Sequence, residues 1–424
     1  MASLSDSKSL GMAAMTNYGA HSSVGWLDYN DDAARKMNET LRALDEPSTL
    51  DPLGLGSIRD AFSDLIAPGT STIHTRLRYF LFIAWICQRI EKSDTTATQF
   101  ASRLRDDEAT LINCLREGGE KEGVQGFTSG IKLKRMPSSA YWGGLRIWGL
   151  RKRDWSLADY GRNITRLRAS KRTDGSDETI SNSLATIWND MPKEPENFLE
   201  SRINFKLTIE EALFIIQRIR ESNPNSLLAF LCSNPGLAGE TRYPWEINTD
   251  SLPAELKNLL FDAQNISELT LGPQLVYNLL IARRAGTELG RDVNDDVAYQ
   301  LELLTQWADL VKSRHSELAE WAKQLDNFWI KLSEGANIPK RAREFVTKMI
   351  HLALEDPDKF AEDSRVQKLV QQREFELKNN RSRFKNLEAL KEWNSPGFGG
   401  QLRFRWQIAE SYLSDLAIAL ESSS

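Results

Sequence analysis

Apolar residues recur at helical spacing along most of the chain. The clearest case is the stretch 291–334, which contains no Gly or Pro. Its apolar positions alternate in steps of four and three, which is typical of a long helix packed along another helix. This seam consists of Val297, Leu301, Leu304, Ala308, Val311, His315, Leu318, Ala322, Leu325, Trp329 and Leu332. A second helix-like stretch, 364–393, is expected to fold back on the first. The pattern therefore predicts a mainly α, multi-domain protein with long paired helices.

Shorter stretches also have a helical period. We expect helices from Ser71 or Thr72 to about Lys92, and over 100–116, 209–221 and 271–285. Thr208 is the predicted cap of the third of these helices, and Pro273 is expected in the first turn of the last, where proline is tolerated. Apolar and polar residues alternate over Leu402–Trp406, which predicts one short strand.

Length and loop composition indicate several domains. A chain of 424 residues exceeds the roughly 250–300 residues of a typical single core. Residues 1–23 are rich in Ser, Ala and Gly and are interpreted as a flexible tail. Five glycines over 117–130 indicate a linker. We expect a helical domain over 24–125, a basic domain over 126–250 and a long-helix domain over 251–424.

The composition is that of an ordinary globular protein, with 41% hydrophobic and 27% charged residues. Three cysteines, Cys87, Cys114 and Cys232, have no disulfide or zinc spacing, which favours a reducing cytoplasm. The longest apolar run, Tyr79–Cys87, has nine residues, whereas a membrane-spanning helix needs about 20. No secretory signal, membrane association, metal or cofactor is expected.

The distribution of charge points to one segment. The whole chain carries −5, but residues 131–172 contain twelve Lys or Arg and only two acids, Asp154 and Asp159. Cationic side chains neutralise phosphates and release counterions, so this segment is the candidate nucleic-acid site. The residues expected to bind are Lys132, Lys134, Arg135, Arg146, Arg151, Lys152, Arg153, Arg162, Arg166 and Arg168.

The same segment has the signals of two short helices joined by a basic turn. Ser138 can cap a helix that runs through Trp148, and Gly149 suits the left-handed position that ends it. Ser156 and Asp159 form a capping box for a second helix to about Ala169. Such an arrangement resembles a helix-turn-helix or winged-helix unit. The side chains of residues 151–153 are expected to point outward from the turn.

Two interpretations of this segment remain open. Its interleaved rings could stack on bases, or they could anchor small helices in a core. Its cations could bind nucleic acid, or they could dock on acidic protein, because the rest of the chain carries −15. The rings concerned are Tyr141, Trp142, Trp148, Trp155 and Tyr160.

Catalytic signals are weak elsewhere. Pro68–Thr72 could open a helix whose N-terminus holds a phosphate, with His74, Arg76 and Arg78 nearby, although a capped helix is the simpler interpretation. Asp60 and Asp64 lie one helical turn apart, and Glu376–Lys378 matches the end of a nuclease signature but falls in a helical pattern. The four histidines have no metal spacing. These observations do not support an enzyme, although they leave an unrecognised active site open.

Several stretches resemble an uncharacterised bacterial family known only as a domain of unknown function. They are Gly25–Asp28, Leu53–Phe62, Pro68–Thr72, Arg76–Phe80, Pro137–Gly144, Tyr277–Leu280 and Phe404–Trp406. The resemblance implies a gene in a phage-defence island, near helicases and nucleases, and brings no site residues with it. The resulting hypothesis is a DNA-binding accessory subunit that positions a partner helicase or nuclease. The alternative is a protein-only scaffold that docks partners through its long helices.

Overall fold

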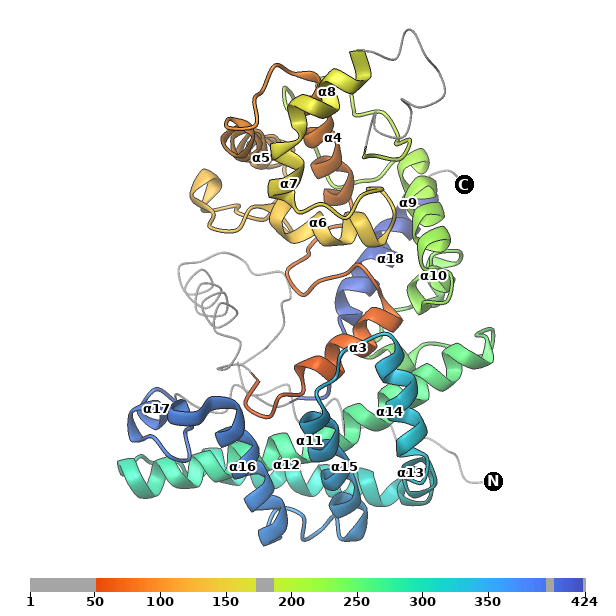
Figure 1. The fold of residues 1–424 in the computed structure, drawn as a ribbon. Coiled ribbons are helices and arrows are strands. Elements are labelled where there is room, and N and C mark those ends of the chain that lie inside the picture. The colour runs from red at the N-terminus through yellow and green to blue at the C-terminus, as the bar shows by residue number, and fades with distance from the viewer. Residues whose placement is uncertain (1–50, 173–186, 394–399, 422–424) are drawn as a thin grey trace. The chain divides into compact units, whose positions relative to one another are not determined.

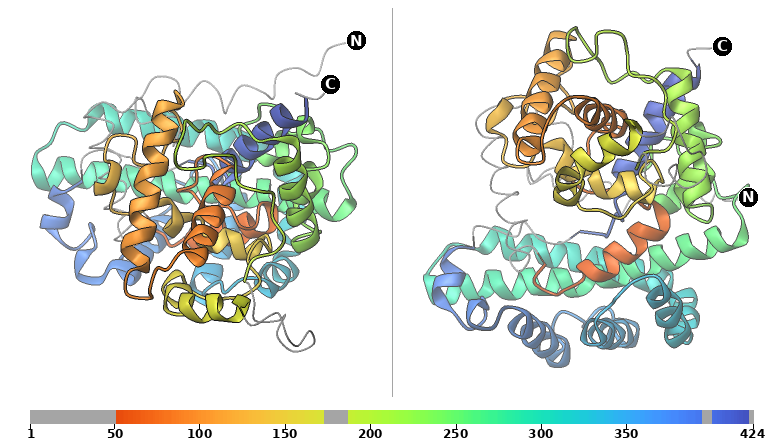
Figure 2. Two further views of the ribbon diagram at one scale, coloured as in Figure 1. Left: turned by 90° about the horizontal axis from the view of Figure 1, so that it is seen from above. Right: turned by 45° about the horizontal axis from the view of Figure 1, so that its top comes forward.

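The chain is mainly helical in its computed structural model, which describes residues 51–172, 187–393 and 400–421 (Figures 1 and 2). Within these residues there is no strand, only one isolated antiparallel bridge between Arg151 and Trp188. The expected tail over 1–23 and the Gly25–Asp28 stretch lie outside the described residues. Among the described helices, none is both long enough and apolar enough to cross a membrane.

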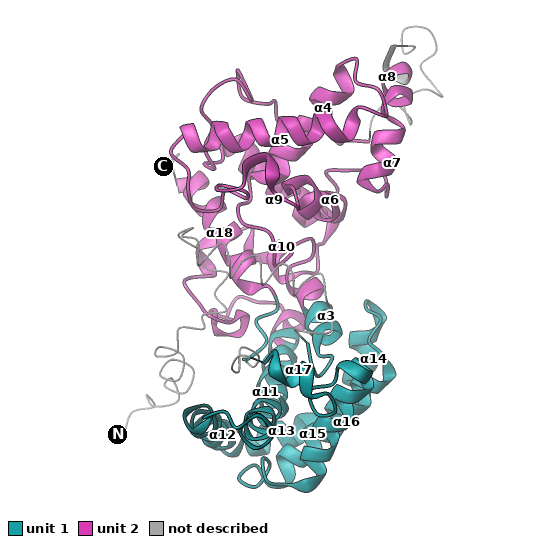
Figure 3. Ribbon diagram, turned by 90° about the vertical axis from the view of Figure 1, so that its left-hand side faces the viewer, with its two compact units in different colours: residues 1–62, 258–404 teal, residues 63–257, 405–424 magenta. Residues whose placement is uncertain are grey.

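The chain forms two compact units, each assembled from separate stretches of sequence (Figure 3). Unit 1 comprises residues 1–62 and 258–404, and unit 2 comprises residues 63–257 and 405–424. The boundaries fall inside two helices, α3 (Gly56–Ile66) and α11 (Ala254–Leu289). The expected consecutive domains at about 125 and 250 remain a prediction, because compactness alone does not test which segments fold independently.

The core of unit 2 is built around one apolar helix. The run that begins at Tyr79 is buried almost completely, and the helix it forms packs against its neighbours α5 and α6. A helix that is apolar all round must be enclosed by other elements, as is the case here. The helices of this unit are α4 (Tyr79–Lys92), α5 (Phe100–Glu117), η1 (Gly130–Lys132), α6 (Pro137–Ile147), α7 (Leu157–Arg162), α8 (Ile164–Arg172), α9 (Ile209–Ser222), α10 (Leu227–Leu231), η2 (Pro235–Leu237), η3 (Pro244–Glu246) and α18 (Trp406–Glu421).

Unit 1 consists of helices with short connections. They are α12 (Asn294–Ser313), α13 (His315–Ala322), α14 (Leu325–Glu334), α15 (Lys340–Glu355), α16 (Ser364–Lys378), η4 (Asn379–Arg381) and α17 (Leu387–Lys391), together with the parts of α3 and α11 in this unit. Helix α15, which was not predicted from the sequence, packs against both α13 and α16. The predicted helix over 364–393 ends early, because Asn379 adopts a left-handed conformation (φ 47°).

The predicted long helix over 291–334 is wrong in its continuity, although much of its seam is buried. The seam is buried from Leu304 to Leu332 except at His315, while Val297 and Leu301 are only partly covered. Arg314 leaves the helical conformation (φ −106°, ψ 11°) and its guanidinium bonds to Glu268 and Asn265 of α11. The predicted helix is thus first interrupted at Arg314, where the side chain forms hydrogen bonds with α11.

The prediction that a helix begins at 271 is also wrong, because Pro273 lies inside the 36-residue helix α11. An interior proline removes one backbone N–H and disturbs the preceding turn. Here the indole Nε1 of Trp307 donates to the Glu268 carbonyl at 2.9 Å. The neighbouring Gly272 gives this ring room, since a Cβ there would lie 2.4 Å from it.

The predicted strand Leu402–Trp406 does not form. Phe404 and Arg405 have positive φ angles of 52° and 58°, which a strand cannot contain. The ring of Phe404 is buried and its centroid lies 4.9 Å from that of Phe62. Packing of this aromatic residue outweighs the local alternation.

All three cysteines are free thiols buried in unit 2. Burial raises the pKa of Cys87 well above its usual value and that of Cys232 to about 12, and it also raises the pKa of Cys114. While the unit is folded, the raised pKa keeps these thiols protonated at neutral pH, and their burial restricts the access of reagents.

Candidate nucleic-acid interface

The basic segment forms three short helices, α6, α7 and α8, instead of the two predicted. The capping box of Ser156 and Asp159 is confirmed, and so is the left-handed Gly149 (φ 67°) after the first helix. The second predicted helix is interrupted at Asn163. No strand is present in this region of the described chain, so a winged-helix form finds no support.

The first helix of the segment is held by a buried carboxylate instead of its predicted cap. The N-cap of α6 is Met136, and Ser138 donates through its backbone N (2.6 Å) and Oγ (3.0 Å) to Glu108 of α5. Burial raises the pKa of Glu108 to about 7, against the lowering effect of the two Ser138 hydrogen bonds. The prediction that Ser138 caps its own helix is therefore wrong.

Most cations of the segment lie at the surface. Seven of the ten candidate residues are exposed, namely Lys132, Lys134, Arg135, Arg146, Lys152, Arg162 and Arg166. Arg153 is half-buried. The side chains of two further basic residues, Lys171 and Arg172, lie outside the description. Of the two acids, Asp159 is already engaged, because it completes the capping box and pairs with Arg162.

The expectation that the side chains of residues 151–153 all point outward is wrong for Arg151. Its side chain is 2% exposed and donates to the carbonyls of Trp155 (2.8 Å) and Trp142 (3.3 Å), and also to that of Arg153. Its guanidinium carbon lies 4.5 Å from the centroid of the Trp142 ring. Burial lowers the pKa of Arg151 to about 10, so it remains charged at neutral pH. Its contacts assign Arg151 to holding the loop instead of contacting a ligand.

Arg168 is also committed to the fold. Its Nε donates to the Glu91 carbonyl at 3.2 Å and its Nη2 to the Thr95 carbonyl at 2.6 Å. These bonds attach α8 to the end of α4. An arginine with its donors on main-chain carbonyls has little left to offer a phosphate.

Four of the five interleaved rings belong to the core, as the packing interpretation expects. Tyr141, Trp142, Trp148 and Tyr160 are buried, whereas Trp155 is half-buried. The guanidinium carbon of Arg153 lies 5.1 Å from the centroid of the Trp155 ring. Trp155 is thus the one ring of this set that retains exposed surface.

The helix expected to begin at Ser71 or Thr72 begins instead at Tyr79, so neither a phosphate-holding N-terminus nor the simpler capped helix forms at Pro68–Thr72. His74 is buried, stacks on Tyr141 with ring centroids 4.0 Å apart, and bonds through Nε2 to the Ala140 carbonyl at 3.0 Å. Its pKa falls to about 4 through burial. The two nearby arginines are also occupied within unit 2: Arg76 pairs with Asp415 and Arg78 with Glu211, each at 2.7 Å.

The weaker catalytic candidates do not form a site. Glu376 and Lys378 lie in helix α16, as the pattern indicated. Lys378 is buried 3.8 Å from Glu374, and burial lowers its pKa to about 8. Among the described residues, no three His, Cys, Asp or Glu side chains gather in a way that could hold a metal ion.

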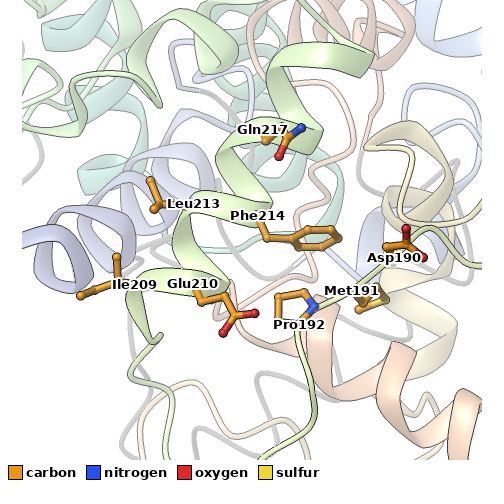
Figure 4. A pocket seen from close by; sticks show the side chains of 8 residues that line it. All are labelled: Asp190, Met191, Pro192, Ile209, Glu210, Leu213, Phe214 and Gln217. Atoms are coloured by element: carbon orange, nitrogen blue, oxygen red, sulfur yellow. The ribbon is translucent and has the colours of Figure 1, made fainter.

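Unit 2 has an open hollow that was not predicted from the sequence. It has a volume of about 680 Å³ and lies between α9 and the segment Asp190–Pro192 (Figure 4). The Phe214 ring projects between these two elements. Ile209 and Leu213 line the hollow as well and are 43% and 54% exposed. The signal in the sequence was the presence of apolar residues at i and i+4 outside the buried face of α9.

The chain belongs to a family described as a family of unknown function, DUF6361, whose model matches residues 21–420. No curated protein and no solved structure matches the chain. The family covers nearly the whole sequence, in agreement with the whole-chain resemblance.

Proposed function

We propose that this chain is a DNA-binding accessory subunit of a bacterial anti-phage defence system, where it positions a partner helicase or nuclease. The observation that carries the DNA-binding part is the exposure of seven of the cations within residues 132–166. The defence role and the partner rest on the family resemblance alone. Arg151 and Arg168, which the fold uses, are left out of the proposed contact set.

The chemistry of this surface suits the phosphate backbone. Each phosphate contact made by Lys or Arg releases about 0.9 of a counterion on duplex DNA, so the affinity of such a surface falls steeply with salt. We therefore expect binding that depends on charge more than on base sequence.

Charge reversal at exposed positions tests the proposal. The variant Lys134→Glu, Arg146→Glu, Lys152→Glu should lose DNA binding and remain folded, because all three side chains are exposed. A matched control, Lys121→Glu, Arg202→Glu, Lys206→Glu, changes the net charge equally at exposed positions of unit 2 outside the segment. Fluorescence anisotropy with single-stranded and duplex probes at two salt concentrations measures the effect. No binding of the wild type to any probe at low salt would overturn the proposal.

A protein scaffold is the second candidate, and the hollow on α9 favours it. Exposed Ile209 and Leu213 offer apolar contacts, while Glu210 and Asp190 add negative charge at its lining. A fitting partner is an amphipathic helix with two apolar anchors and flanking lysines or arginines. If this candidate holds, Leu213→Asp should abolish co-purification of that partner from the native host, and the charge-reversed triple variant should not.

A further inference from the structure

We infer that the nucleic acid bound by this chain is single-stranded, and that one of its bases stacks on Trp155. This inference rests on the proposed DNA binding and specifies which form of DNA the surface selects. It follows from the way in which the loop between α6 and α7 is built, which is independent of the number of cations around it.

The loop is fixed from inside unit 2. The Trp155 carbonyl accepts two hydrogen bonds, from Trp142 Nε1 and from Arg151 Nη1, both at 2.8 Å. Both donor side chains are buried. The backbone N of Lys152 also donates to the Ile187 carbonyl at 2.6 Å. A non-helical loop with this many buried anchors has its backbone, and so the Cα position of Trp155, fixed before any ligand arrives.

The exposed face of this loop combines a ring with cations. Trp155 is half-buried, the Arg153 guanidinium carbon lies over its ring at 5.1 Å from the centroid, and Lys152, which precedes Arg153 in the chain, is exposed. The other rings of the segment are buried, so Trp155 is the ring of this set that a base could reach. A flat ring with a guanidinium on one face can accept a base on the other face, while exposed cations such as Lys152 contact the adjoining phosphates.

Stacking distinguishes single strands from duplexes. In a duplex each base already lies between its neighbours, and a protein ring reaches it only if the base leaves the stack. A single strand offers its bases at far lower cost, and every base has a π-face, so this contact needs no particular sequence. The geometry therefore points to unpaired DNA as the preferred ligand. The surrounding cations can contact the phosphates of single-stranded and duplex DNA alike.

The test compares two substitutions of one side chain in the full-length protein. Trp155→Leu removes the ring but retains an apolar side chain, and Trp155→Phe retains a ring. We expect Trp155→Leu to weaken binding of a thymidine oligomer about 5- to 150-fold, and Trp155→Phe to recover much of that loss. Affinity for a duplex hairpin should change little. The control is Trp245→Leu, at another half-buried tryptophan of unit 2, which should bind as the wild type does.

The possible results distinguish base stacking on Trp155 from DNA binding by the exposed cations. Suppose that Trp155→Leu binds the oligomer as tightly as wild type while the charge-reversed triple variant does not bind. Stacking is then overturned and DNA binding stands. Equal losses in Trp155→Leu and Trp155→Phe, with both proteins folded by circular dichroism, would also overturn stacking. Absence of binding in the wild type would defeat both.

Discussion

In unit 2, several buried tryptophan and tyrosine side chains donate to segments without regular structure, whereas Tyr160 donates to the Cys87 carbonyl within α4. Trp85 Nε1 donates to the Pro192 carbonyl at 2.9 Å and Trp148 Nε1 to the Pro68 carbonyl at 2.7 Å. In unit 1, the tryptophans bond instead to residues within helices, as Trp307 does with Glu268. A neutral side chain of α11 also bonds within its own helix, since Thr270 Oγ1 donates to the Ile266 carbonyl at 2.6 Å.

This difference shows two ways of meeting the hydrogen-bonding needs of a buried backbone. Helices satisfy their own N–H and C=O groups, and where unit 1 has a loop carbonyl to satisfy, an arginine supplies the donor, as Arg373 Nε does for the Leu53 carbonyl at 2.9 Å. Loops cannot satisfy their own groups in this way, and each of their buried carbonyls needs a partner from elsewhere. The aromatic donors of unit 2 supply that partner and apolar bulk in one side chain. Disrupting the helix seam should therefore destabilise the whole of unit 1. Removing one hydrogen-bonding hydroxyl or indole N–H in unit 2 should loosen only the loop to which it is bonded.

The largest effect is expected for the helix seam of unit 1. Leu304 and Leu318 are 6% and 0% exposed. Replacing both with Asp places two charges on apolar surface, at a cost of several kcal/mol each, so unit 1 should lose its folded structure. Thermal unfolding by circular dichroism and hydrogen exchange of α12 and α13 measure this. Leu301→Asp is the matched control, because Leu301 is 37% exposed. Wild-type melting in the double variant would show that the seam is not a core.

A smaller effect is expected for the buried ion pair of unit 2. Arg78→Met leaves Glu211 without its partner at 2.7 Å and removes a donor to the Asn204 carbonyl. Breaking one side of a buried pair costs about 3–5 kcal/mol. Arg103→Met is the control, since Arg103 is largely exposed where it pairs with Asp107 and should contribute about 0–1 kcal/mol. Chemical denaturation compares them, and equal losses in both variants would contradict the prediction.

The next effect depends on pH. The pKa of His74 falls from 6.5 to about 4 in the folded state, so the unfolded chain binds the proton first. The stability that the neutral ring contributes is present above pH 6.5 and lost as the pH falls toward 4, up to about 3 kcal/mol. His74→Phe keeps a ring against Tyr141 and removes this titration. Its free energy of unfolding should therefore fall less between pH 6.5 and 4.

Glu108 works in the opposite direction and must be separated from His74. Its folded pKa is raised from 4.5 to about 7, so its contribution to stability grows as the pH falls from 7 to 4.5. The relevant quantity is therefore the difference between wild type and His74→Phe at each pH, in which the Glu108 contribution cancels. A difference that does not vary with pH would show that His74 titrates normally.

The smallest and most local effect is expected for one tyrosine hydroxyl of unit 2. Tyr141 Oη accepts from the backbone N of Thr75 (2.8 Å) and of Arg76 (3.2 Å), and donates to the Arg76 carbonyl at 3.1 Å. Tyr141→Phe leaves these groups unpaired, at a cost of about 1–3 kcal/mol. Hydrogen exchange should accelerate in residues 71–78 and remain unchanged in unit 1. Uniform acceleration would contradict the idea that this hydroxyl holds one loop.

Local signals in the sequence predicted local structure well. The cap at Thr208, the capping box at Ser156 and the left-handed Gly149 depend on neighbouring residues alone and are present. The mainly helical class follows from periodicity and is confirmed. The spacing of residues 71–78 predicts a helix, but these residues are not helical. Their two arginines form ion pairs with residues far away in sequence, Arg76 with Asp415 and Arg78 with Glu211.

The candidate interface was predictable only as a segment. Counting cations located it, and the structure describes seven of the ten candidate side chains as exposed. Nothing local distinguishes Arg151 from Lys152, because the burial of Arg151 depends on the carbonyls of Trp142 and Trp155. The choice of which ring stays at the surface depends on the same packing. Whether the segment binds DNA stays a prediction.

The three buried thiols allow the rate at which unit 2 opens to be measured by thiol labelling. All the cysteines of the chain lie in unit 2, and unit 1 contains none. A thiol-specific reagent such as a maleimide would therefore label the native protein only as fast as unit 2 opens, whatever happens in unit 1. A single cysteine introduced at the surface would react long before them. The wild-type chain is thus ready for site-specific dye attachment without prior removal of its own cysteines.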